Sequence, residues 1–166
     1  MKRATLAAAL LLTALAAPAA AAGSGKGTAA GAFLRLAPGA RGAALGEALG
    51  GAADDAYAAW YNPAGLGPLE RVEAAGAHES RFEGLAYDAL ILVVPMLSWT
   101  DSPRRSNAFG TAALSVYGLS ANDIERRGLV ETDAPSGRFA LSDRAYALSY
   151  GWSVPGAGLS AGASAK

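Results

Sequence analysis

Few residues of this 166-residue chain have the type and spacing for chemistry. The segment Gly23–Thr28, which contains Lys26, resembles the end of a phosphate-binding loop. That loop needs a glycine where Ala20 stands and a hydroxyl residue directly after the lysine, where Gly27 stands. It must also follow a buried strand and open a helix. We therefore interpret the segment as a flexible linker and predict no nucleotide site.

Asp54 and Asp55 are the other candidates, as a metal-binding or general-acid pair. Adjacent residues point apart on a helix, so helix capping with a solvated or lumen-facing charge fits the pair better. The chain has no cysteine and one histidine, His78, which leaves little for a zinc site or a Ser-His-Asp triad. We interpret His78 as an interface or loop residue. We predict no enzyme activity, with no catalytic residue, cofactor or metal site.

The first element of the chain has the layout of an export signal. Lys2 and Arg3 precede the apolar run Ala4–Ala17, Pro18 breaks the helix, and Ala20–Ala22 offers several A-x-A cleavage frames. The leucine-rich part is shorter than the about 20 apolar residues that a membrane-spanning helix needs. Residues 1–22 are therefore predicted to be a secretory signal peptide, and the mature protein is expected outside the cytoplasm.

Composition separates this chain from an ordinary soluble domain. Charged residues make up 17%, below the roughly 25% of soluble domains. The apolar fraction is inflated by alanine, which suits closely spaced strands or backbone packed on backbone better than an interdigitated core. Formal charge is zero, and removing Lys2 and Arg3 leaves 12 basic against 14 acidic residues. No basic surface indicates a nucleic-acid partner.

A Gly/Ala-rich stretch occupies most of residues 23–70. Gly42, Gly46 and Gly50 recur at regular spacing and put small faces on one side of a loose helical turn, which allows close backbone approach. The spacing does not match the dinucleotide-binding G-x-G-x-x-G pattern.

This stretch ends in two short helical turns. Asp54 is predicted to cap a helix that runs to about residue 60. Pro63 disfavours helical geometry at Asn62 and ends that helix. Asn62 is then expected to cap a second turn with Pro63 at its first position, closed by Gly65 and Gly67.

Residues 71–166 read as short strands separated by turn residues. Arg144–Val154 alternates most cleanly, with Tyr146 and Leu148 on one face and Ala147 and Ser149 on the other. Phe109–Leu119 alternates in the same way, with Ala112, Leu114 and Val116 opposite Thr111, Ser115 and Tyr117. The five predicted strands are Val72–Glu79, Leu85–Pro95, Phe109–Leu119, Arg144–Val154 and the segment from Leu159 onward.

Strand length and connections favour a membrane barrel. The apolar run Ala89–Leu97 is too short for a spanning helix but has the length of a tilted spanning strand. Short connections (Ser80–Gly84, Gly156–Gly158) and long polar ones (Ser98–Asn107, Ala121–Ser142) are interpreted as short turns opposite long loops, as in outer-membrane barrels. The alternative is a soluble periplasmic antiparallel sandwich that serves a binding or structural role.

Several motifs resemble one family, the PorV/PorQ-like outer-membrane proteins, which are relatives of the FadL-type long-chain fatty acid transporters. The most specific part is the pair Asp54 and Asp55 followed by Trp60-Tyr61-Asn62-Pro63-Ala64-Gly65-Leu66. The resemblance also covers the following segments: Phe33–Ala48, Tyr87-Asp88 with Val94-Pro95, Ser120–Glu125, and Phe139–Asp143 leading into Leu148–Gly151.

The resemblance implies an all-β antiparallel barrel of about fourteen strands, with the N-terminal segment folded inside as a plug. Its structural motif would be Gly42, Gly46, Asp54, Asp55, Trp60, Asn62, Pro63, Ala64 and Gly65. It implies a place in the outer membrane of a Gram-negative-type bacterium, with membrane lipid and either hydrophobic small molecules or secretion-system proteins as partners. About five strands cannot close a barrel. We therefore expect the sequence to be an N-terminal fragment or a truncated gene product.

Overall fold

The computed structural model describes residues 31–96, 109–128, 133–154 and 156–166. The predicted signal peptide, the loop around Lys26 and the whole of the predicted 98–107 connection lie outside these ranges. Residues 31–166 form one compact unit.

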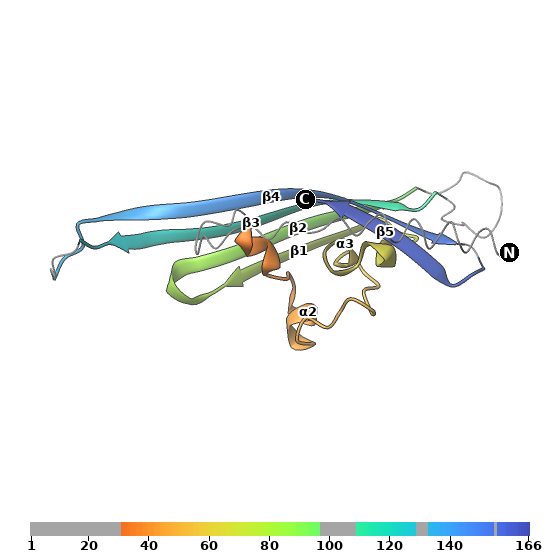
Figure 1. Cartoon of the computed structure of the whole chain (residues 1–166), viewed down its shortest axis with the longest axis horizontal. Helices are drawn as coiled ribbons and strands as arrows, with labels where there is room; N and C mark the ends of the chain where they lie inside the picture. The colour runs from red at the N-terminus through yellow and green to blue at the C-terminus, as the bar shows by residue number, and fades with distance from the viewer. Residues whose placement is uncertain (1–30, 97–108, 129–132, 155) are drawn as a thin grey trace, which may run out of the picture. The chain divides into compact units, whose positions relative to one another are not determined.

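The strands form a single antiparallel sheet in sequence order, β1-β2-β3-β4-β5 (Figure 1). Every strand pairs with the next one along the chain, as in a simple meander. The strands are β1 (Glu73–Ser80), β2 (Leu85–Pro95), β3 (Thr111–Arg126), β4 (Gly137–Val154) and β5 (Leu159–Ala165). The predicted antiparallel all-β class is confirmed, and the sheet in the described residues is open.

The part of the chain before the sheet, here called the N-terminal segment (residues 31–70), consists of short helical turns. They are η1 (Ala32–Arg35), α2 (Ala40–Ala44), α3 (Ala58–Tyr61) and η2 (Pro63–Leu66), and a further turn, η3 (Phe82–Gly84), joins β1 to β2. Glycine and proline at the ends of these turns stop each from growing, because glycine leaves helical geometry at little cost and proline lacks an N–H. No helix among the described residues is long and apolar enough to cross a membrane.

The two faces of the sheet differ in the way the alternation predicts. Ile91, Ser115 and Ala147 lie in one cross-strand row, and all three are buried. The neighbouring row of Leu92, Leu114 and Leu148 is 45%, 56% and 61% exposed. The outward face therefore exposes leucines, while the inward face buries large side chains of β2 and β3, such as Ile91 and Tyr117, together with small or polar ones.

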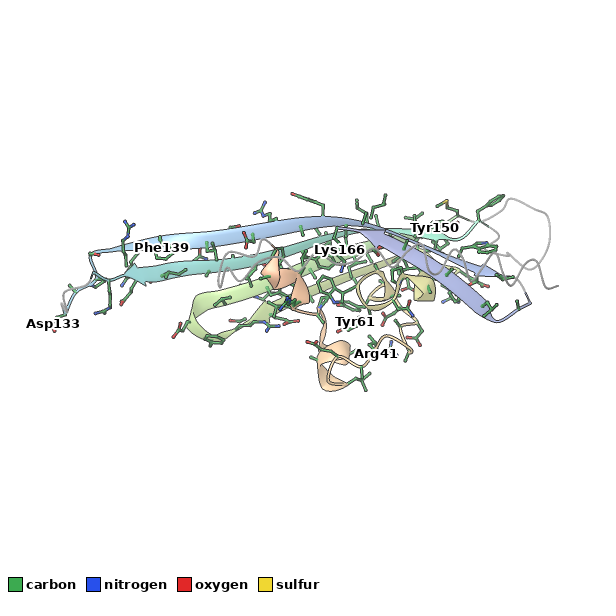
Figure 2. The ribbon with its side chains drawn as sticks, viewed as in Figure 1. Arg41, Tyr61, Asp133, Phe139, Tyr150 and Lys166 are labelled. Atoms are coloured by element: carbon green, nitrogen blue, oxygen red, sulfur yellow. The ribbon has the colours of Figure 1, made fainter. Side chains whose placement is uncertain are left out.

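The N-terminal segment covers the inward face. Phe33, Leu49 and Leu66 are buried against strand residues such as Ile91 and Tyr117. Figure 2 shows Arg41 and Tyr61 on this side of the sheet and Tyr150 on the other. The hydrophobic core thus lies between the helical turns and one face of the sheet.

The expected long loop Ala121–Ser142 is largely strand. β3 continues to Arg126 and β4 begins at Gly137, so this hairpin extends past β1 and β2 (Figure 1). A bulge separates Ala121 from Ile124, and Asp123 has a positive φ of 66°. The sequence did not predict this part of the strands, because most of its residues are exposed and polar rather than packed on a core.

The expectation of short turns opposite long loops is wrong. Alternate connections of an antiparallel meander fall at the same end of the sheet, so the short η3 turn lies at the same end as the β3–β4 connection. The short β4–β5 connection, around Gly156, lies at the other end. Connection length therefore does not distinguish the two ends of this sheet.

Candidate functional site at the contact between the N-terminal segment and the sheet

The turn Pro63–Leu66 packs directly on the backbone of two strands. A Cβ on Gly151 would lie 2.8 Å from the Gly67 nitrogen, and a Cβ on Gly162 would lie 2.6 Å from the Pro63 carbonyl oxygen. A Cβ on Gly67 would lie 2.8 Å from the Trp152 carbonyl carbon. Only glycine permits this approach, so β4 and β5 hold the turn through main-chain contact.

Serine hydroxyls complete this contact at the end of α3. The Ala59 carbonyl would normally accept from the N–H four residues later, but that residue is Pro63, which has none. Ser149 Oγ donates to this carbonyl at 3.2 Å and Ser164 Oγ at 3.5 Å, and the two hydroxyls lie 2.6 Å apart. The inward-facing serines therefore satisfy a carbonyl that the helix cannot. Thr111 Oγ1 similarly donates to the Leu69 carbonyl at 3.2 Å.

Asn62 fixes the geometry between the two turns. Its side-chain oxygen accepts from the Ala64 N–H at 3.2 Å, and its side-chain nitrogen donates to the Gly50 carbonyl at 2.8 Å. Its backbone is extended, as proline at the next position requires. The predicted cap with Pro63 at the first helical position is confirmed.

Trp60 joins the segment to the middle of the sheet. Its ring lies edge-on to Tyr117 with centroids 4.6 Å apart, and Lys166 Nζ lies 3.8 Å from the Trp60 ring centroid. Such aromatic and cation–π contacts each contribute about 0.5–1.5 kcal/mol beyond area burial. The predicted motif residue Trp60 therefore connects α3 to both β3 and the end of β5.

Arg41 holds the two aspartates together. Its Nη1 contacts Asp54 Oδ1 and lies 2.8 Å from Asp55 Oδ2. The hydrogen bond from Arg41, with its charge, holds the pKa of Asp54 below the usual range. The prediction that Asp54 caps this helix is wrong: the N-cap residue of α3 is Tyr57, and Asp55 Oδ1 accepts from the Tyr57 N–H at 2.9 Å in the turn before the helix. The pair thus closes the loop between α2 and α3.

The glycines predicted to allow close packing divide into two groups. A Cβ on Gly42 would lie 2.6 Å from the Tyr61 ring, and one on Gly65 would meet the Ala53 carbonyl oxygen. Gly46 and Gly50 meet nothing within 4 Å. Gly46 instead has a positive φ of 61°, so it serves the turn after α2.

The inward face also buries hydroxyl groups, which a purely apolar core would not contain. Tyr87 OH, Tyr117 OH and Ser115 Oγ are buried without a hydrogen-bond partner among the described residues. Buried polar atoms normally find a partner in protein or water. The residues described here contain no cluster of three or more potential metal-binding side chains.

Sequence reasoning found the turn motif but not its partners on the strands. The alternation predicts Ser149 and Gly151 as small residues on one face of their strand, and Gly162 and Ser164 lie in the last predicted strand with no role predicted for them. A glycine on the inward face of a strand is the available signal, because it commonly marks close approach of another backbone. Which backbone approaches can be read only from the folded chain.

No protein-family model, curated protein or solved structure matches this chain. The function must therefore be argued from the geometry.

Gly151→Ala tests the main-chain contact. The added methyl group would collide with the Pro63–Gly67 turn, and such overpacking costs about 1–3 kcal/mol. We expect trypsin to cleave after Arg35 and Arg41 about tenfold faster in this variant, because 1.4 kcal/mol corresponds to tenfold. Gly137→Ala, on the same strand with nothing within 4 Å, is the control and should cleave like the parent. Equal rates for Gly151→Ala would contradict the contact.

A pH titration tests the Arg41 contact. Because the pKa of Asp54 is lowered in the folded chain, the pair contributes stability above the ordinary Asp pKa and loses it as the pH falls through the folded value. In Arg41→Gln we expect the Asp54 pKa, measured by NMR of the labelled carboxyl, to rise toward its ordinary value. Arg35→Gln is the control and should leave Asp54 unchanged. An unaltered titration in Arg41→Gln would refute the pairing.

Proposed function

We propose that this chain forms part of the wall of an outer-membrane β-barrel, with its N-terminal segment lying against the lumen face. The observation that carries the proposal is the outward face, where Leu92, Leu114 and Leu148 form an exposed apolar row. Apolar residues at neighbouring positions, including Leu90, Val94, Tyr146 and Trp152, extend it. Contiguous apolar surface of this kind indicates a membrane or a protein partner.

The reversed polarity of the two faces supports a membrane over a protein partner. A soluble sheet buries its large apolar side chains and exposes small polar ones. Here the buried face carries Thr111, Ser115 and Ser149 beside Ile91 and Tyr117, while the leucines of the other face stay exposed. Barrel strands in membranes alternate in this sense, apolar toward lipid and polar toward the lumen.

The extent of the apolar band and its aromatic edges fit a bilayer. The outward positions from Tyr146 to Trp152 span about 20 Å at about 3.4 Å per residue. Outer-membrane barrels have an apolar band about 25 Å tall with aromatic residues at both edges. Tyr146 stands at one end of the band on β4, with Tyr150 and Trp152 toward the other. Beyond the band, the β3–β4 hairpin carries exposed charges, including Asp123, which pairs with Arg138 at 2.8 Å.

The proposed barrel has one structural requirement, and it could serve either of two roles. A closed barrel needs further strands to pair with the outer edges of β1 and β5. With the lumen covered by the N-terminal segment, the barrel would serve either passage of hydrophobic small molecules or a protein-secretion apparatus, as the PorV/PorQ-like resemblance implies. The turn Trp60–Leu66 and its docking on the strand glycines support a plug in both roles.

Leu148→Arg tests whether the outward face meets lipid. A charged residue at the middle of a barrel's lipid face costs about 2–4 kcal/mol, so we expect much less protein in the outer-membrane fraction. Leu141→Arg is the control, since Leu141 is also an exposed leucine of β4 but lies on the opposite face of the strand, an odd number of residues from Leu148. Recovery of the parent in the soluble periplasm, or equal recovery of the two variants, would contradict the proposal. The first result would favour a soluble periplasmic domain.

A deletion strain separates the two roles. Loss of long-chain fatty-acid uptake with normal secretion of surface proteins would support passage of small molecules. The reverse result would support a secretion role. A deletion strain with normal fatty-acid uptake and normal secretion of surface proteins would contradict both roles.

A further inference from the structure

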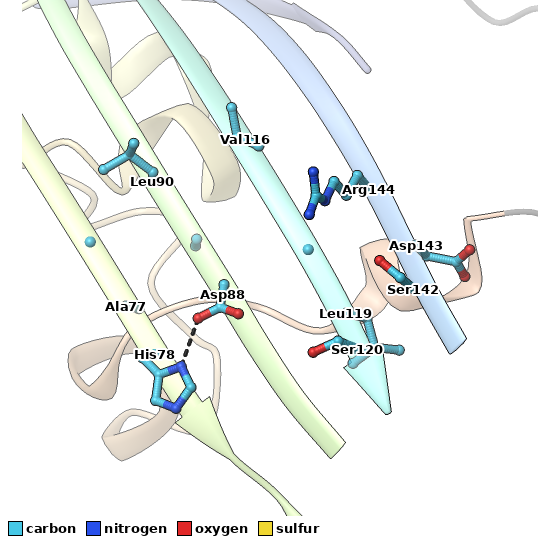
Figure 3. Close-up of a pocket in the computed structure, with 13 residues that line it drawn as sticks. Ala77, His78, Asp88, Leu90, Val116, Leu119, Ser120, Ser142, Asp143 and Arg144 are labelled. Atoms are coloured by element: carbon cyan, nitrogen blue, oxygen red, sulfur yellow. Dashed lines mark hydrogen bonds and ion pairs between the residues drawn. The ribbon is translucent and has the colours of Figure 1, made fainter. Parts of the chain in front are cut away.

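One cross-strand row on the outward face carries charges beside the apolar band. His78, Asp88, Gly118 and Arg144 lie in register on β1, β2, β3 and β4. Figure 3 shows His78, Asp88 and Arg144 on neighbouring strands, below Leu90 and Val116. Gly118 has no side chain, so the surface between Asp88 and Arg144 is left open.

This opening is part of a groove of about 670 Å³. Leu90 and Val116 border it on the side of the apolar band, and Ser120 and Ser142 border it on the side of the hairpin. The groove therefore lies where apolar surface gives way to polar surface. In a membrane-embedded sheet, that level is occupied by lipid headgroups.

The two sides of the groove carry opposite charges, Asp88 on one side and Arg144 on the other. His78 Nδ1 lies 2.6 Å from Asp88 Oδ1, which leaves the second carboxylate oxygen free for another donor. Arg144 is exposed and has no ion-pair partner within the part of the chain that the structure describes. Its planar guanidinium matches a phosphate in bidentate geometry.

We propose that this groove binds the headgroup of phosphatidylethanolamine. The phosphate binds Arg144, the ammonium donates to Asp88 across Gly118, and the acyl chains lie along Leu90 and Val116. This inference rests on the proposed membrane location of the sheet. A zwitterionic headgroup satisfies both charges, whereas an anionic headgroup such as phosphatidylglycerol offers no cation to Asp88.

The test is native mass spectrometry of the purified chain in micelles that contain equal amounts of phosphatidylethanolamine and phosphatidylglycerol. We expect the parent to carry phosphatidylethanolamine preferentially. Arg144→Gln should reduce that binding about tenfold, because charge-assisted hydrogen bonds to phosphate are the strong ones. Asp88→Asn should abolish the preference over phosphatidylglycerol. Arg126→Gln, an exposed arginine of the hairpin end outside the groove, is the control and should bind like the parent.

Flotation of the same preparations with phosphatidylcholine vesicles distinguishes a failure of the headgroup site from a failure of the proposed membrane location. If the parent floats but Arg144→Gln keeps its phosphatidylethanolamine, or the parent prefers phosphatidylglycerol, the headgroup site is overturned and the membrane location stands. If the parent does not float, both are overturned. Preferential binding lost in Arg144→Gln and retained in Arg126→Gln supports the site.

Discussion

The main-chain contact between the Pro63–Leu66 turn and the inward faces of β4 and β5 is the constraint on which the rest of this fold depends. Glycines at 67, 151 and 162 allow it, because a methyl group at any of them would collide with the opposing chain. Ser149 and Ser164 then satisfy the carbonyl of Ala59, which the proline at 63 leaves unpaired. An interface built from backbone and hydroxyls needs little apolar area, so the large apolar residues are available for the outward face.

That division explains the composition. Alanine, glycine and serine line the inward face of β4, where the Pro63–Leu66 turn lies directly on the strand. On β2 and β3 the N-terminal segment packs instead on larger side chains, such as Ile91 and Tyr117. Leucine and aromatic residues alternate with them and remain exposed on the opposite face. Such alternation could also form half of a soluble sandwich. Here the exposed leucine and aromatic residues point outward, which is the direction expected of a barrel wall. The charged row of Asp88 and Arg144 ends the apolar band, and the β3–β4 hairpin continues beyond it with polar residues on both faces.

Local signals in the sequence predicted the elements and the two faces of the strands, because alternation and proline act over a few residues. The Asn62 cap and the Tyr146–Trp152 alternation are examples. The extension of β3 to Arg126 could not be predicted, since its residues are polar and only pairing with β4 makes them a strand. Likewise, the cap predicted at Asp54 does not form, because both aspartates contact Arg41 and only Asp55 accepts from a backbone N–H, that of Tyr57.

The central claim, that the outward face meets lipid, is tested most directly by spin labels along β4. The chain lacks cysteine, so single cysteines can be labelled specifically. In lipid vesicles, we predict high oxygen collision rates at Tyr146, Leu148, Tyr150 and Trp152, with low rates at Ala145, Ala147 and Ser149. High collision rates with a water-soluble nickel complex at Leu148 and Tyr150 would contradict the account, because they would show that this face is solvated.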